Sequence, residues 1–264
     1  MYAFNYHKPT SLAEVQSLLA KAEDGKLLAG GHTYIPTLKQ RLAQPSDVID
    51  LSGVAELKGI EEEAGGVTIG AMTTHGQIAR SEIVRRVIPG LAGMAAVVGD
   101  PQVRNRGTMG GALANNDPAS DYPGAVIGLA ATIRTDKREI AGDDFITGMF
   151  ETALEDGEII TAITFSAPDK CAYSKFPNPA SRYAMAGVFV AKSGDGVRVG
   201  VTGAGSDGVF RWSEAEAALG SDFSAGALDG LSVDEGGMLS DIHGDAAYRA
   251  NLVKVMAKRA VEAA

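Results

Sequence analysis

RNRGTMGGALANNDPASDYP, residues 104–123, is the stretch that decides how this chain is interpreted. Its glycine pair at 110–111 has no Cβ atoms, so the backbone there can take a positive φ or lie directly against a ligand. The residues at 115–118 favour turns over helix and strand interiors. The stretch predicts an ordered loop that offers N–H donors, the hydroxyl of Thr108 and the carboxylate of Asp121 to a polar ligand. An ordinary turn between two core elements fits the same residues equally well.

A second glycine loop lies near the start of the chain, in LLAGGHTYIP, residues 27–36. A short apolar strand is followed by a double-glycine turn and then by a helix start, with Thr33 in the capping region and Pro36 in the first turn. A glycine turn that leads into a helix presents free N–H groups, which can bind phosphate without a lysine. Two such loops in a chain of net charge −9 predict that backbone amides bind an anionic cofactor.

Composition places limits on the class of protein. The 264 residues are 45% hydrophobic, which is typical of a globular protein with one large or two modest domains. The 33 acidic residues against 24 basic ones argue against nucleic acid or an anionic membrane as a partner. Cys171 is the only cysteine, so the chain can form no internal disulfide and no iron–sulfur cluster of its own, and we expect a reducing compartment.

The sequence gives no sign of a targeting or membrane segment. Its first residues have no basic region followed by an apolar run, as a secretory signal would. The longest apolar runs, 91–98 and 125–133, fall short of the ~20 residues that cross a bilayer. We therefore expect a cytoplasmic protein with no transmembrane segment.

Residue patterns predict an α+β fold with strands and helices interspersed along the chain. Capping boxes at Ser11 and Thr74 mark two helix starts, and Ser213 is expected to cap a third. The predicted strands are 2–6, 27–29, 48–51, 57–60, 67–71, 132–135, 138–140, 158–165, 172–176, 188–192 and 197–202, with a hairpin turn at 193–196. Further helices are predicted at 35–42, 89–98, 124–130, 143–150 and 246–260.

The two glycine loops carry a family resemblance. AGGHTYIPTLKQRL (29–42) and DPQVRNRGTMGGALANNDPASDYP (100–123) resemble the flavin loops of the FAD-binding medium subunit of molybdenum hydroxylases. Aerobic carbon monoxide dehydrogenases resemble the chain more closely than do the flavin domains of xanthine dehydrogenases. The similarity continues in order through 143–165, 173–188 and 246–260, so it covers nearly the whole chain. Met109 departs from the isoleucine that is more common there, a change that preserves apolar volume.

The resemblance implies a domain organisation. It implies a two-lobed FAD-binding domain of the vanillyl-alcohol-oxidase or PCMH type at 1–167, with lobes at about 1–53 and 54–167. A small C-terminal α+β domain with an antiparallel sheet, of the carbon monoxide dehydrogenase flavoprotein type, would then occupy 168–264.

The resemblance also implies an oxidoreductase function. FAD would be bound noncovalently, and the chain would take electrons from the 2Fe–2S clusters of a small partner subunit and pass them to quinone, NAD or oxygen. A large subunit that carries the molybdenum cofactor would oxidise the substrate, in a dimer of heterotrimers. A stand-alone flavoprotein or NAD-dependent oxidoreductase is one alternative, and a binding module without catalytic function is another.

The first loop is predicted to bind the FAD pyrophosphate through its backbone, at Ala29, Gly30, Gly31, His32 and Thr33. The side chain of His32 fits either a hydrogen bond near the ligand or an ordinary loop histidine. We expect no covalent link to FAD at this histidine, because the family that the chain resembles holds FAD noncovalently.

The second loop is predicted to contribute the hydroxyl of Thr108, the amides of Gly110, Gly111 and Ala112, and the carboxylate of Asp121. Asp121 would accept a hydrogen bond from a flavin ring N–H or a ribityl or ribose hydroxyl, although capping of the following helix also suits an aspartate. The resemblance adds Ile160 as an apolar contact and Lys175 as a lysine near the flavin ring, against the alternative of a solvated strand lysine. No residue is predicted to be catalytic or to bind a metal.

The sequence leaves the roles of two further features open, and it argues against a dinucleotide-binding site at a third. Arg104 and Arg106 could contact phosphate, a partner's carboxylates or a surface acid, and 182–183 could line the cofactor face. The sequence GAGSDG at 203–208 matches a dinucleotide-binding pattern, but no helix is predicted to open at these glycines. We therefore expect no Rossmann site there.

Overall fold

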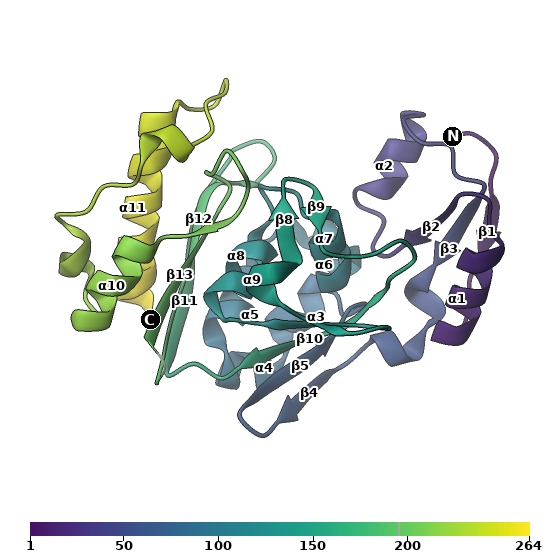
Figure 1. Ribbon diagram of the computed structural model, residues 1–264, viewed down its shortest axis with the longest axis horizontal. Coiled ribbons are helices and arrows are strands. Elements are labelled where there is room, and N and C mark those ends of the chain that lie inside the picture. The colour runs from purple at the N-terminus through teal and green to yellow at the C-terminus, as the bar shows by residue number, and fades with distance from the viewer. Residues whose placement is uncertain (195) are drawn as a thin grey trace.

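The computed structural model describes residues 1–194 and 196–264 and confirms the α+β class. The described chain forms sheets of three, five and four strands in that order, and a two-stranded pair lies in sequence before the last strand of the five-stranded sheet. Figure 1 places the N-terminal lobe at one end, the five-stranded sheet and its helices in the middle, and the C-terminal helices at the other end. No helix among these residues is long and apolar enough to cross a membrane.

The N-terminal lobe is a three-stranded parallel sheet with strand order β1-β3-β2. Its elements are β1 (Asn5–His7), α1 (Leu12–Lys21), β2 (Gly25–Leu28), α2 (Tyr34–Lys39) and β3 (Asp47–Asp50). Ser11 Oγ accepts the N–H of Glu14 at 3.3 Å, as the capping box predicts. The Glu14 carboxylate instead accepts the N–H of Thr10 at 2.7 Å, so only half of the predicted box forms.

The second lobe is built on an antiparallel sheet with strand order β4-β5-β10-β6-β7, and its helices include those that form the second glycine loop. Its strands are β4 (Ile60–Glu63), β5 (Gly66–Gly70), β6 (Thr132–Thr135), β7 (Glu139–Ala141) and β10 (Ile160–Ser166), with β8 (Ile146–Gly148) and β9 (Glu151–Thr152) as a separate pair. Its helices are α3 (His75–Arg80), α4 (Glu82–Val87), α5 (Pro89–Ala96), α6 (Pro101–Arg106), α7 (Met109–Asn115), α8 (Asp121–Gly128) and α9 (Gly142–Phe145).

Three predictions in this lobe are wrong. The strand predicted at 57–60 begins only at Ile60, because residues 55–57 form a 3-10 helix. The stretch at 104–123 is mostly helical, because Asp100 and Thr108 accept backbone N–H groups and thereby start α6 and α7. Only the segment from Asn116, which has a φ of 40°, to Ser120 is non-helical between α7 and α8. The helix predicted at 143–150 ends at Phe145, because the following residues pair as β8 with β9.

The C-terminal part forms an antiparallel sheet with strand order β11-β12-β13-β14. Its elements are β11 (Lys170–Pro177), β12 (Ala184–Ser193), β13 (Gly196–Thr202), β14 (Phe210–Arg211), α10 (Ser213–Ser221) and α11 (Ala246–Ala263). Trp212 rather than Ser213 is the N-cap residue of α10, so that predicted cap is wrong. The hairpin turn predicted at 193–196 contains residue 195, which lies outside the described residues.

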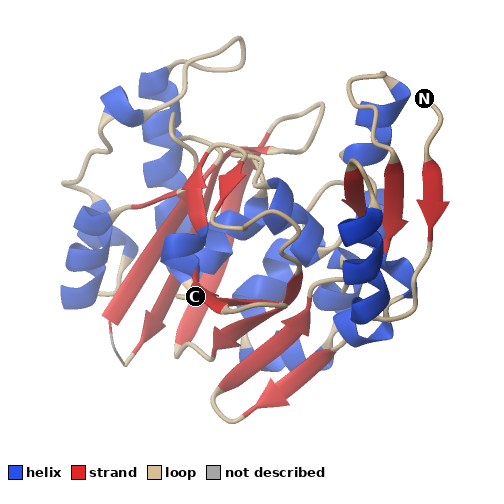
Figure 2. Cartoon of the chain, turned by 45° about the vertical axis from the view of Figure 1, so that its right-hand side comes forward, coloured by secondary structure: helices blue, strands red, loops and turns tan. Residues whose placement is uncertain are grey.

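The sheet of β11, β12 and β13 is covered on both faces (Figure 2). Side chains of β12 alternate between the two faces. Phe189 and Ala191 pack with the apolar side chains of the second lobe, whereas Val188 and Val190 pack with α11 on the other face. Helix α5 approaches so closely that a Cβ on Gly90 would lie 3.0 Å from the Cα atom of Ala172. The second lobe and one face of this sheet therefore share one apolar core, whereas the other face packs with α11 in a second core.

The thiol of Cys171 lies within this shared core. It is buried, and its Sγ atom accepts the N–H of Gly90 at 3.4 Å. Burial raises the pKa of the thiol above its ordinary value. The predicted boundary between 167 and 168 falls between β10 and β11, and it stays a prediction because the packing is continuous across it.

Candidate functional site

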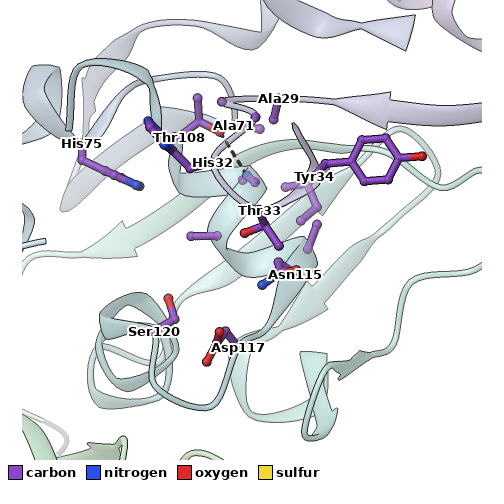
Figure 3. Close-up of a pocket in the computed structure, with 18 of the residues that line it drawn as sticks. Ala29, His32, Thr33, Tyr34, Ala71, His75, Thr108, Asn115, Asp117 and Ser120 are labelled. Carbon is purple, nitrogen blue, oxygen red and sulfur yellow. Dashed lines mark hydrogen bonds between the residues drawn. The ribbon is translucent and has the colours of Figure 1, made fainter. Parts of the chain in front are cut away.

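A cavity of about 490 Å³ lies where the two lobes meet the loop between β11 and β12. Figure 3 shows side chains from both glycine loops directed towards this space. Every residue predicted for the site except Lys175 lines it, namely Ala29, Gly30, Gly31, His32, Thr33, Thr108, Gly110, Gly111, Ala112, Asp121 and Ile160.

The two glycine loops touch each other at one corner of the cavity. A Cβ on Gly30 would lie 2.7 Å from the Cα atom of Gly107 and closer still to the Arg106 carbonyl oxygen. Gly31 is constrained differently, because its φ of +80° lies in the region that favours glycine. Glycine is therefore required at 30 for close approach and at 31 for the turn.

The first loop has free donors beside the cavity. Within residues 1–194 and 196–264, the backbone N–H groups of Gly30, Gly31, His32 and Thr33 donate no hydrogen bond. The carbonyl oxygens of Gly31 and Thr33 are occupied, because they accept the N–H groups of Ile35 and Thr37 at 3.1 and 3.2 Å. Consecutive free amides around a glycine turn form an anion-binding concavity.

The second loop differs from its prediction, because its amides are already bonded within the protein. The N–H of Gly110 donates to the Ala71 carbonyl at 2.8 Å, that of Gly111 to Thr108 Oγ1 at 3.2 Å, and that of Ala112 to the Thr108 carbonyl at 3.0 Å. The prediction that these three amides are offered to a ligand is contradicted. These residues contribute a close-packed wall instead.

Asp121 is held in a buried network at the edge of the cavity. Its carboxylate, which is 4% exposed, accepts the Tyr173 hydroxyl at 2.5 Å and Lys175 Nζ at 3.0 and 3.1 Å. Burial raises the pKa of the Asp121 carboxyl, and both Lys175 and Tyr173 oppose that shift. Asp121 is the first residue of α8 rather than its cap, which is Ser120. The helix-cap alternative is therefore wrong.

Lys175 lies behind Asp121 and is absent from the cavity wall. Its side chain is 6% exposed, so the alternative of a solvated strand lysine is wrong. The ion pair instead connects β11 to the first turn of α8. Any effect of Lys175 on a ligand in the cavity would have to act through Asp121 in this conformation, and a direct contact stays a prediction.

Sequence reasoning missed His75 and several other lining residues. His75 is the first residue of α3, where the Thr74 capping box places it; its side chain is 4% exposed, and Nδ1 lies 3.1 Å from the Tyr122 hydroxyl. Burial lowers the pKa of His75 to about 4, with smaller contributions from His32 and Arg104. A single histidine after a capping threonine carried no signal of a site. The wall also includes Lys26, Tyr34, Met72, Asn115, Asp117, Ser120 and Ile159.

The structure resolves most of the features that the sequence left open. Arg104 donates to the carbonyl oxygens of Val98 and Gly99 at 3.0 and 3.1 Å, so it stabilises the turn before α6. Arg182 and Tyr183 line the cavity from the loop between β11 and β12. The sequence at 203–208 connects the antiparallel strands β13 and β14 and opens no helix. This segment therefore lacks the helix start that a Rossmann dinucleotide site requires.

The residues present fit FAD. The volume of the cavity lies within the range of ~300–1,000 Å³ that is usual for ligand and cofactor sites. Free amides at one corner suit a diphosphate, and Leu51, Ile159 and Ile160 offer apolar surface to aromatic rings. The buried carboxylate of Asp121 offers an oriented acceptor at the cavity edge.

Known proteins resemble this chain in both sequence and structure. A family model described as the FAD binding domain in molybdopterin dehydrogenase matches residues 2–168. The carbon monoxide dehydrogenase medium chain of Hydrogenophaga pseudoflava is 36% identical over 99% of this chain and 96% of its own length. The nicotine 6-hydroxylase medium subunit of Paenarthrobacter nicotinovorans is 36% identical over 98% and 96% of the two chains.

A solved structure gives the same result. A chain of reconstituted CO dehydrogenase from Oligotropha carboxidovorans superposes with a TM-score of 0.89 at 35% identity, covering 99% of this chain and 97% of that one. The predicted two-lobed FAD-binding fold with an additional C-terminal part is confirmed by this match. This chain therefore belongs to the family of FAD-binding domains of molybdopterin dehydrogenases.

Proposed function

We propose that this chain is the FAD-carrying electron-transfer subunit of a molybdenum-containing hydroxylase or dehydrogenase. It would receive electrons from 2Fe–2S clusters of a partner subunit and deliver them to an external acceptor. The observation that carries the proposal is the row of unpaired amides at 30–33 beside a cavity of cofactor size. When bound, FAD supplies the ability to accept single electrons and to release two together.

Each part of the site has a role in this proposal. The amides of Gly30, Gly31, His32 and Thr33 would bind the diphosphate, because they have no other acceptor among the described residues and lie on the cavity wall. Ala29 would close that corner, since its Cβ atom lies 3.1 Å from where a Cβ on Gly111 would be.

The second loop would position the first. The hydroxyl of Thr108 accepts the N–H of Gly111 and so starts α7, against which the first loop rests. Gly110 and Ala112 complete this wall, and their amides stay bonded within the protein. Ile160 would add apolar surface for the ring system.

Asp121 would orient the ring or the ribityl chain. Its carboxylate is fixed by Tyr173 and Lys175, so an acceptor oxygen is held ready at the cavity edge with no freedom to turn away. Lys175 would influence the flavin mainly through this ion pair, because its positive charge offsets the carboxylate. Removal of the charge would leave a more negative site and lower the flavin potential.

The proposed partners follow from the relatives, two of which are medium chains or subunits of larger complexes. A large subunit with the molybdenum cofactor and a small subunit with 2Fe–2S clusters would complete a dimer of heterotrimers. Cys171 is the single cysteine of the sequence and forms no disulfide, which is consistent with a reducing compartment, and we propose the cytoplasm. The substrate would be chosen by the large subunit.

Purification of the tagged full chain from its native source tests the proposal. The expected complex contains FAD, molybdenum and iron, with two further subunits. FAD without molybdenum or iron would favour a stand-alone flavoprotein and refute the assignment to a complex. Loss of all flavin, with no recovery after incubation with FAD, would refute the cofactor site itself.

A further inference from the structure

We propose that His75 belongs to the cofactor site and that its Nε2–H donates a hydrogen bond to a phosphoryl oxygen of the bound dinucleotide. The inference rests on the proposed function, because it assigns a further contact within the same cavity. It also adds a side-chain donor to an anion site otherwise built from backbone amides.

The position of His75 is fixed by its neighbours in sequence and in space. Thr74 and Gln77 form a complete capping box around the start of α3, and the N–H of His75 donates to the Gly107 carbonyl at 3.0 Å. The imidazole lines the cavity, and Figure 3 shows it directed inward, near His32 and Thr108. The ring is therefore anchored before any ligand arrives.

The tautomer of His75 follows from its contact with Tyr122. The Tyr122 side chain is 1% exposed, and the part of the chain that the structure describes offers its hydroxyl no partner other than His75 Nδ1, at 3.1 Å. A buried hydroxyl needs an acceptor for its proton, and burial raises the pKa of this phenol, so it stays protonated. Tyr122 therefore donates to Nδ1, and the proton of the neutral imidazole resides on Nε2.

Nε2 lies at the seam between the two glycine loops. A Cβ on Gly107 would lie 2.6 Å from Nε2, and a Cβ on Gly30 would lie 2.7 Å from the Cα atom of the same Gly107. No acceptor for Nε2 is found within residues 1–194 and 196–264. A side chain that is 96% buried thus aims an unused donor at the corner where the amides of the first loop are also free.

The chemistry of this donor selects its ligand. A neutral imidazole with its proton on Nε2 can only donate from that atom, so the ligand group must be an acceptor. Beside a row of backbone N–H groups, the matching acceptor is a phosphoryl oxygen, which carries the charge that these donors favour. If only a sugar or a ring of the ligand lay at this corner, the free amides of the first loop would have no anion to bind.

Two matched amide substitutions test the proposal in the tagged full chain, together with any subunits that copurify. His75→Gln can place its amide nitrogen at the position of Nε2, whereas His75→Asn reaches only the position of Nδ1. After removal of FAD, the Kd for added FAD is measured by flavin fluorescence. His75→Gln is expected to bind within about threefold of the wild type, and His75→Asn to bind about tenfold to a hundredfold more weakly. Equal affinity of the two variants would overturn the proposal.

Control measurements separate a binding effect from a folding effect. The thermal midpoint of each FAD-free variant is recorded by circular dichroism, and Tyr122→Phe is expected to weaken FAD binding less than His75→Asn does. If the Asn variant fails to fold, nitrogen-15 NMR of labelled histidines in the wild type decides. An Nε2–H tautomer whose resonance shifts on FAD binding supports the proposal, and an Nδ1–H tautomer overturns it. Failure of the wild type to bind FAD would refute the proposed function instead.

Discussion

Replacement of Gly30 by alanine is expected to separate the two glycine loops. The new Cβ atom would lie 2.7 Å from the Gly107 Cα atom and closer to the Arg106 carbonyl oxygen, whereas real Cβ contacts stay beyond 3.0 Å. Both obstacles are backbone atoms of α6 and its C-terminal end, so neither can rotate out of the way. The φ of Gly30 lies outside the left-handed region, so the cost comes from this overlap alone.

The magnitude follows from the overlap. Crowding of a packed site by an added methyl group costs about 1–3 kcal/mol, which lowers the thermal midpoint of a chain of this size by about 2–4 °C per kcal/mol. The free amides of the first loop would move with Gly30, so the Kd for FAD should rise by about tenfold, equivalent to ~1.4 kcal/mol.

Gly93→Ala is the matched control. Gly93 lies on the exposed side of α5, and a Cβ there would meet nothing within 4 Å. Alanine is the better helix former by up to ~1 kcal/mol, so this variant should be as stable as the wild type or more so. Thermal unfolding and FAD titration are measured on both variants. If Gly30→Ala matched Gly93→Ala in both, the proposed contact between the loops would be refuted.

Three further predictions concern the network around the cavity. Asp121→Asn should destabilise the chain by about 3–5 kcal/mol in urea unfolding, because it leaves the buried Lys175 ammonium without its carboxylate; addition of Lys175→Met should restore part of that loss, and failure to do so would argue against the ion pair. Hydrogen bonds from Arg138, and to a lesser extent from the Glu155 N–H and Thr135, lower the pKa of Glu158 from 4.5 to about 2 against the opposing effect of burial, so Glu158 contributes stability above pH ~5 that is lost as the pH falls towards 2. The stability of Glu158→Gln should therefore depend less on pH over that window, and an unchanged profile would contradict the assignment. Thr108→Ala should cost about 1 kcal/mol in urea unfolding, because the Gly111 N–H loses its acceptor; no change in the urea midpoint would show that this cap contributes nothing.

Local patterns made much of the fold predictable. The full capping box at Thr74 is present as expected, as are the strands at 67–71 and 132–135 to within a residue or two. These elements depend on side chains a few positions apart, so the sequence alone contains their cause. The prediction of a helix at 143–150 was wrong in its second half. From Ile146 the backbone forms a strand that pairs with the strand containing Thr152, and strand pairing competes with local helix formation.

The hydrogen-bond partners of polar groups in the site were harder to predict from the sequence than the helices and strands. The predicted positions lie together around one cavity, but the amide of Gly110 is occupied by a carbonyl on a different segment, at Ala71. Asp121 and Lys175 are 54 positions apart, and His75 and Tyr122 are 47 apart. Such pairings depend on how segments far apart in the sequence pack together, which no spacing rule encodes, so the burial of Lys175 and the role of His75 could not be foreseen.

The position of Cys171 has a practical consequence for following the motion of this molecule. Its sulfur is closed off by the backbone of α5 at Gly90, and a thiol reagent must reach the thiolate, which burial disfavours. Alkylation should therefore proceed only during the moments when β11 draws away from that helix. The rate at which Cys171 is alkylated would therefore measure how often the contact between the flavin lobe and the C-terminal sheet opens. No cysteine would have to be introduced for this measurement.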